Sequence, residues 1–327
     1  MIAAVSPKLQ PYTAGFPGKY TFENPGGKTH PTAEAFAPFK DRLGLSWSED
    51  YFYIESNGIP DHQMMVGITA WQQQVPLPHG YVKDNAWRLP LKPVPSADPA
   101  MIKGRFLRGA IAIGVNGIPI FNPQNNRGEI SQEIGELDQW GGHCGRGDDY
   151  HYHIAPLHLE KVVGKGNPVA YALDGYPVLG LSEADGTIPG DLDKCSGHDH
   201  DGLGYHYHAT ESYPYVIGGF HGEVVEAEGQ VDPQPRAEGV RPAERPLRGA
   251  EITGFSGTID QGYTLEYQVD GKKASIQYQV TKTGADFTYH DSDGSIRKQS
   301  YQHSPGGKGK GRPKEDKGKG DRRRPEQ

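Results

Sequence analysis

The chain contains 327 residues and has a formal net charge of −7. It has no run of 18 or more apolar residues, which excludes a hydrophobic membrane-spanning helix. Residues 304–327 carry nine basic and four acidic side chains, so the rest of the chain has a net charge of −12, and an acidic body argues against a nucleic-acid partner.

The composition favours strands over helices. The chain has 45 glycines and 27 prolines beside 4 tryptophans, 18 tyrosines and 10 phenylalanines. So many turn-forming residues in an aromatic-rich chain indicate short strands joined by many turns. We therefore expect a mainly β fold with short helices and a loop-rich main domain.

Changes in sequence texture predict five segments. An extended, Pro- and Gly-rich N-terminal arm (1–44) precedes the main domain (45–225), and an acidic, Pro-rich linker (226–245) follows it. Residues 246–303 alternate apolar and polar around Asp-Gly and Thr-Gly turns, which predicts a small antiparallel β unit. Residues 304–327 cannot bury enough apolar surface to fold, so we expect a disordered basic tail.

One four-residue pattern occurs three times in the main domain: Asn or Asp, then Gly, an apolar residue and Pro. It spans residues 57–60, 116–119 and 174–177. Gly supplies the positive φ that a tight turn needs, and Pro cannot donate to a strand ladder. The pattern predicts three similar hairpins.

A longer unit occurs twice. Tyr150-His151-Tyr152-His153 is repeated as Tyr205-His206-Tyr207-His208, and each copy follows one of the turns described above. The copies span about 109–155 and 168–210. Two copies predict a pseudo-two-fold internal duplication and not a long array of repeats.

The two cysteines, Cys144 and Cys195, each lie between the turn and the tetrapeptide of one copy. Cysteines placed by a duplication are expected to face each other across the pseudo-two-fold axis. The preferred interpretation is therefore a Cys144–Cys195 disulfide, which would indicate an oxidising compartment. Two buried free thiols, or metal ligation by the thiols, are the alternatives.

The histidines of the tetrapeptides are the main candidates for chemistry. Side chains of a strand alternate between its faces, so the two imidazoles of each copy share one face and the two tyrosines share the other. Such His-x-His pairs can chelate a metal, and nearby histidines and acids add further donors. The candidate ligands are His143, Asp149, His151, His153, His198, His200, Asp201, His206, His208 and His221.

Imidazole and carboxylate donors suit a divalent transition metal such as Zn, Cu or Fe. The alternative is a structural network in which these histidines and tyrosines hydrogen-bond to carbonyls and carboxylates without metal. Whether the two His-x-His strands converge on one site is not determined by the sequence.

Several motifs together resemble the YHYH domain family. They are the duplicated tetrapeptide, the stretches Gly141–Asp149 and Ala172–Pro177, and the closing Gly219-Phe220-His221-Gly222. The resemblance covers residues 50–224 and implies a secreted or cell-surface bacterial protein. It implies no reaction.

We therefore expect an exported metal-binding protein with a His-rich site, and sequence does not determine whether it is an enzyme. Export is inferred although no signal peptide is visible at the N-terminus. The alternative function is a cell-surface binding or scaffolding module. The expected partner is a small molecule or a surface polymer, and the oligomeric state is not determined.

Overall fold

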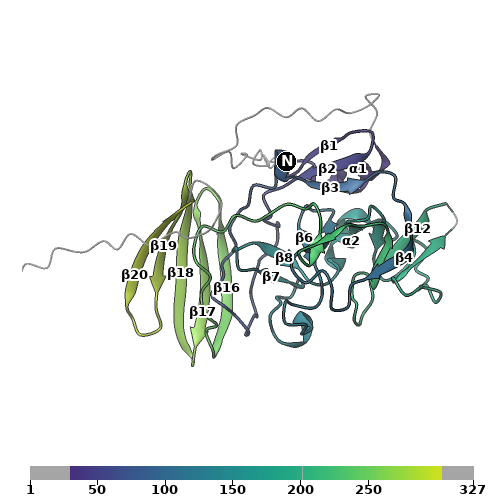
Figure 1. Ribbon diagram of the computed structural model, residues 1–327. Coiled ribbons are helices and arrows are strands. Elements are labelled where there is room, and N and C mark those ends of the chain that lie inside the picture. Colours follow the sequence, from purple (N-terminus) through teal and green to yellow (C-terminus); the bar gives the residue numbers. More distant parts are fainter. Residues whose placement is uncertain (1–29, 201, 304–327) are drawn as a thin grey trace, which may run out of the picture.

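The computed structural model describes residues 30–200 and 202–303, and strands dominate it (Figure 1). The prediction of a mainly β, loop-rich fold is confirmed. The described residues form two short α-helices, α1 (Pro31–Phe36) and α2 (Glu160–Val163). Four short 3-10 helices accompany them: η2 (Ala37–Phe39), η3 (Lys83–Asn85), η4 (Ser131–Glu133) and η5 (Leu157–Leu159). No helix of the described part of the chain is both long and apolar enough to cross a membrane.

A three-stranded antiparallel sheet lies near the start of the described chain. It contains, in spatial order, β1 (Gly44–Trp47), β2 (Tyr51–Glu55) and β3 (Trp87–Pro90). Phe36 of α1 contacts Phe52 of β2 and Tyr171 of the main sheet, with ring centroids 5.5 and 5.7 Å apart. These aromatic contacts join α1 and this sheet to the main sheet. Residues 1–29 of the predicted arm lie outside the described residues.

The main sheet has eight strands in the order β11-β12-β10-β9-β5-β6-β8-β7. The antiparallel pair of β5 and β9 lies at its centre. On one side of this pair, β6 is antiparallel to β5, β8 is parallel to β6, and the edge strand β7 is antiparallel to β8. On the other side, β10 is antiparallel to β9, β12 is parallel to β10, and the edge strand β11 is antiparallel to β12. The strands are β5 (Ala110–Gly114), β6 (Pro119–Phe121), β7 (Gly142–Cys144), β8 (Tyr150–Tyr152), β9 (Ala170–Ala172), β10 (Pro177–Leu179), β11 (Gly197–His200) and β12 (Gly204–His208).

The two halves of this sheet therefore repeat one pairing pattern about the central pair, although duplication of the sequence itself stays a prediction. Two of the three predicted hairpins join the inner strands of the halves, with Gly117 and Gly175 at φ of 78° and 98°. The hairpin predicted at residues 57–60 is wrong. Gly58 has a positive φ of 69°, but β2 pairs with β1 and β3, and a long loop follows it.

The predicted disulfide is also wrong: Cys144 and Cys195 are buried free thiols. Cys144 ends β7 at one edge of the main sheet, whereas Cys195 precedes β11 at the other edge. The two are not equivalent by register, since Cys144 pairs with Tyr150 while Asp199 pairs with Tyr205. Neighbouring strands are about 4.8 Å apart and a disulfide needs Cα atoms within about 7 Å, so strands at opposite edges cannot be bridged.

Three further sheets complete the fold. β4 (Pro95–Met101) pairs with β13 (Gly219–Gly222), and β14 (Glu226–Ala227) pairs with β15 (Gln230–Val231). The C-terminal sheet is an antiparallel meander that forms a separate layer beside the rest of the molecule (Figure 1). Its strands are β16 (Ala250–Thr258), β17 (Gly262–Val269), β18 (Lys272–Thr281), β19 (Gly284–His290) and β20 (Ile296–Gln302). The predicted basic tail, 304–327, lies outside the described residues.

The segment predicted as a linker contributes to the junction between the C-terminal sheet and the main domain. Arg241 forms a bidentate ion pair with Asp148, with both N–O distances 2.8 Å and both side chains 3 % exposed. Tyr278 of β18 donates a hydrogen bond to the carbonyl of Pro76 at 2.6 Å. Polar contacts of this kind fix how the sheet lies on the main domain.

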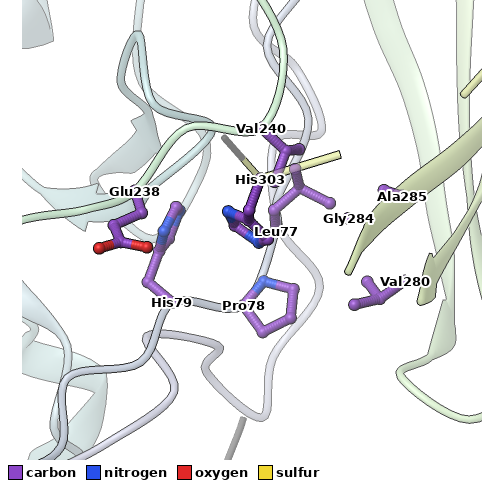
Figure 2. Close-up of a pocket in the computed structure, with 9 residues that line it drawn as sticks. All are labelled: Leu77, Pro78, His79, Glu238, Val240, Val280, Gly284, Ala285 and His303. Carbon is purple, nitrogen blue, oxygen red and sulfur yellow. The ribbon is translucent and has the colours of Figure 1, made fainter. Parts of the chain in front are cut away.

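A small cavity lies at the same junction (Figure 2). His79, Glu238 and His303 supply its polar lining, and the buried Nε2 of His79 has no hydrogen-bond partner among the described residues. The volume of about 10 Å³ suits a single water molecule, so this cavity is too small to be a ligand site.

Breaking the Arg241–Asp148 pair tests its role at the junction. Arg241→Met should lower the free energy of unfolding by about 3–5 kcal/mol, because the Asp148 carboxylate would remain buried without its cation. Arg105→Met, which removes the exposed ion pair to Glu226, is the matched control and should cost less than about 1 kcal/mol. Urea denaturation measures both, and equal small effects would contradict a structural role for the buried pair.

The state of the cysteines can be tested by mass spectrometry. Protein denatured without reductant should gain two alkyl groups from iodoacetamide, whereas native protein should gain none. Both thiols are buried, and burial raises the pKa of Cys195 to about 11 and that of Cys144 well above its usual range, which disfavours the reactive thiolate. Denatured, unreduced protein that gains no alkyl group would indicate a disulfide.

Candidate metal centres

The two tetrapeptides lie on β8 and β12, and the predicted alternation of their side chains is observed. On β12, the imidazoles of His206 and His208 lie together with their Nε2 atoms 3.1 Å apart. Tyr205 and Tyr207 contact each other and His221 on the opposite face. The neighbouring edge strands then add one more histidine to each pair, because His143 pairs with His151 and His198 pairs with His206.

Three imidazoles meet in the first half of the sheet. The first His cluster consists of His143, His151 and His153, whose ring centroids are 4.8–5.0 Å apart. The Nε2 atoms of His143 and His153 approach to 3.0 Å, and one ligand atom from each residue lies within 4.8 Å of the others.

The second half contains the same arrangement with a carboxylate added. The second His cluster consists of His198, His206 and His208, with ring centroids 4.8–5.2 Å apart. Glu183 Oε1 lies 3.0, 3.4 and 3.2 Å from the Nε2 atoms of these three residues. Adjacent ligands at bonds of about 2.0–2.1 Å around one ion are about 3.0–3.4 Å apart, so the spacing fits a single metal ion.

The Nδ1 atoms of four of the six imidazoles lie against backbone carbonyls. In the first His cluster, Nδ1 of His151 lies 2.9 Å from the Asp149 carbonyl, and Nδ1 of His153 lies 2.5 Å from the Asn122 carbonyl. In the second, His206 and His208 bond to the carbonyls of Gly204 and Gly180 at 2.8 and 3.0 Å.

A carbonyl can only accept, so these four Nδ1 atoms carry the hydrogen and the tautomer of each ring is set. The Nε2 atoms are then free to act as ligands. Acceptors behind the ligating histidines are the usual outer layer of a metal site.

Burial keeps several of these imidazoles neutral. It lowers the pKa of His143 and His153 well below the usual value, and the neighbouring imidazoles lower it further. Burial likewise lowers the pKa of His208. The neutral imidazole is the form that binds metal, so no proton competes for these nitrogens at neutral pH.

The two clusters are separate centres. β8 and β12 are separated in the main sheet by β6, β5, β9 and β10, so the two His-x-His pairs do not converge on one site. The sequence left this question open.

Three of the remaining predicted ligands, Asp149, His200 and His221, lie outside the clusters. Asp149 Oδ2 lies 3.4 Å from Nδ1 of His151 and therefore behind the ring. His200 is exposed and stacks on His198 with centroids 5.9 Å apart, at the rim of the second His cluster. His221 stacks on Tyr205 on the opposite face, with centroids 3.5 Å apart. Asp201 is outside the described residues.

Glu183 is the residue that sequence reasoning missed. It lies in the loop after β10, within an acidic stretch that resembles an ordinary solvated turn. The only sequence feature that could have indicated Glu183 is the alignment of the two copies, in which the loop 183–187 corresponds to the loop 125–129. Both loops close with the same backbone bonds, from Glu183 N to Thr187 O at 2.9 Å and from Asn125 N to Glu129 O at 2.8 Å.

The tyrosine face forms a hydrogen-bonded network, as the alternative interpretation predicted for these residues. Tyr150 donates to Asp138 at 2.8 Å, and Tyr205 donates to Asp193 at 3.0 Å. Tyr207 donates to Asp174 at 2.5 Å. These hydrogen bonds hold β8 and β12 in place through one face, and the histidines of the two strands lie on the opposite face.

Comparison with known proteins adds a family. Residues 86–189 match the family model described as YHYH protein. This segment is therefore similar to the YHYH family. It contains the first His cluster and Glu183, whereas the three histidines of the second His cluster lie beyond it. No curated protein and no solved structure gives a significant match to the chain.

If the tyrosine network stabilises the main sheet, removing one of its hydroxyl groups should destabilise the protein. Tyr207→Phe should lower the free energy of unfolding by about 1–3 kcal/mol, because the buried Asp174 carboxylate loses a donor. Tyr176→Phe is the control, since its ring packs on Tyr205 and its hydroxyl has no hydrogen-bond partner among the described residues. Thermal unfolding of both variants measures the difference, and an unchanged Tyr207→Phe protein would argue against the network.

Proposed function

We propose that the protein binds two divalent transition-metal ions, one at the first His cluster and one at the second. The observation that carries the proposal is the approach of imidazole Nε2 atoms to 3.0–3.2 Å in both clusters. For His206 and His208 the carbonyl acceptors place both hydrogens on Nδ1, so the two Nε2 lone pairs face each other at 3.1 Å, and a cation between them would attract both. Nitrogen and carboxylate donors suit Zn, Cu or Fe.

Two further observations support the proposal. Four of the donor rings are held by carbonyls, so little side-chain entropy is lost when they bind an ion. Both clusters also have nearly the same geometry, although only the first lies within the matched segment. We propose in addition that the protein is exported, for which the resemblance to the YHYH family is the support.

Metal content tests the proposal. Untagged protein should carry two ions per chain after incubation with Zn²⁺ and removal of free metal. His151→Ala and His206→Ala should each carry one, and the double variant should carry none, because each substitution removes a ligand from one cluster only. Inductively coupled plasma mass spectrometry gives the ratios.

His221→Ala is the matched control, because His221 is a histidine of the same region that lies on the tyrosine face. It should keep two ions. Wild-type protein that carries no metal after incubation with Zn²⁺, Cu²⁺ and Fe²⁺ would sink the proposal, as would a double variant that keeps both ions.

A further inference from the structure

The two His clusters differ at one position. In the second, Glu183 Oε1 lies within 3.4 Å of all three Nε2 atoms and completes a four-donor set. The equivalent position of the first half is Asn125, which begins the matching loop. An amide is a weaker metal ligand than a carboxylate. Whether Asn125 can bind an ion at all depends on the hydrogen bonds that its side chain already makes.

The side chain of Asn125 is occupied elsewhere. Its Nδ2 donates to Glu129 and to Glu136, at 3.0 and 3.2 Å. Its Oδ1 accepts from the backbone N–H groups of Arg127 and Glu129, at 2.9 and 3.1 Å. All of its hydrogen-bonding capacity is used within its own loop and by Glu136, so it supplies no ligand atom to the first His cluster.

No other acid or thiol replaces it. Among the described residues, the group of potential ligands at this cluster contains only His143, His151 and His153. Cys144 is adjacent to His143 in sequence, but alternation along β7 directs its side chain to the other face of the sheet. The cluster thus offers three nitrogens and leaves at least one position of a bound ion open.

We infer that the two centres have different roles: the second holds its ion in a closed set of protein ligands, whereas the first binds water or a small anion at an open position of its ion. This inference rests on the proposed metal binding. Three neutral imidazoles also leave the charge of a divalent ion uncompensated, which favours an anionic ligand.

Access to the first His cluster limits the size of that ligand. His151 and His153 are 3 % and 4 % exposed, and the ring of Phe121 covers His151 with centroids 3.9 Å apart. Only His143, on the edge strand, is partly exposed. The ligand therefore belongs to the class of two- or three-atom species such as hydroxide, peroxide or azide. A three-His zinc site with an open position is a set in which bound water has a pKa of about 7.

Cobalt and azide test the inference in the full-length protein. With Co²⁺ bound, His206→Ala keeps only the first centre and His151→Ala keeps only the second. Azide should shift the visible Co²⁺ spectrum of His206→Ala, and its apparent dissociation constant there should be at least about tenfold lower than for His151→Ala. Adding Glu183→Gln to His151→Ala should bring back an azide response, because it weakens the fourth ligand.

The outcomes separate the two proposals. If neither single variant binds Co²⁺, the metal-binding proposal itself fails. If each binds one Co²⁺ but both respond to azide alike, or neither responds, metal binding stands and the difference between the centres is wrong. His143→Ala, at the partly exposed edge, serves as a second way to remove the first centre if His151→Ala does not fold.

Discussion

The two His clusters depend on strand pairing that brings imidazole nitrogens within 3.0–3.2 Å of one another. Carbonyls behind two rings of each cluster hold the hydrogen on Nδ1. The rings cannot rotate away without breaking those bonds and leaving buried carbonyls unsatisfied. This arrangement supports the proposal that each cluster binds a cation.

On the opposite face of the same strands, tyrosine hydrogen bonds hold the backbone that positions the histidines. Tyrosines that alternate with the clustered histidines donate to buried carboxylates, as Tyr150 does to Asp138 and Tyr207 does to Asp174. Asp174 also begins the turn between β9 and β10, so the network links β12 to the neighbouring hairpin. The tyrosine network therefore lies on one face of these strands and the His clusters lie on the other.

Strand alternation and turn patterns could be predicted from the sequence, whereas the pairing of strands far apart in the chain could not. The alternation of His151 and His153 follows from strand geometry, and the positive φ at Gly117 and Gly175 follows from the turn pattern. The parallel pairings of β6 with β8 and of β10 with β12 have no local signal in the sequence, yet they place the two histidine pairs in opposite halves of the sheet.

The disulfide prediction failed for a related reason. The order of the residues along the chain suggested that Cys144 and Cys195 occupy equivalent positions, but the strand register shows that they do not. Glu183 was missed because only the fold, and no local pattern, brings this loop acid to the three histidines of the second His cluster.

Anomalous X-ray diffraction from crystals of the metal-loaded protein, recorded at the absorption edge of the ion, can locate the proposed ions. If each half of the sheet binds its own ion, two anomalous peaks are expected, one among His143, His151 and His153 and one among Glu183, His198, His206 and His208. Peaks elsewhere, or no peak at either cluster in protein shown to be loaded, would contradict the proposal.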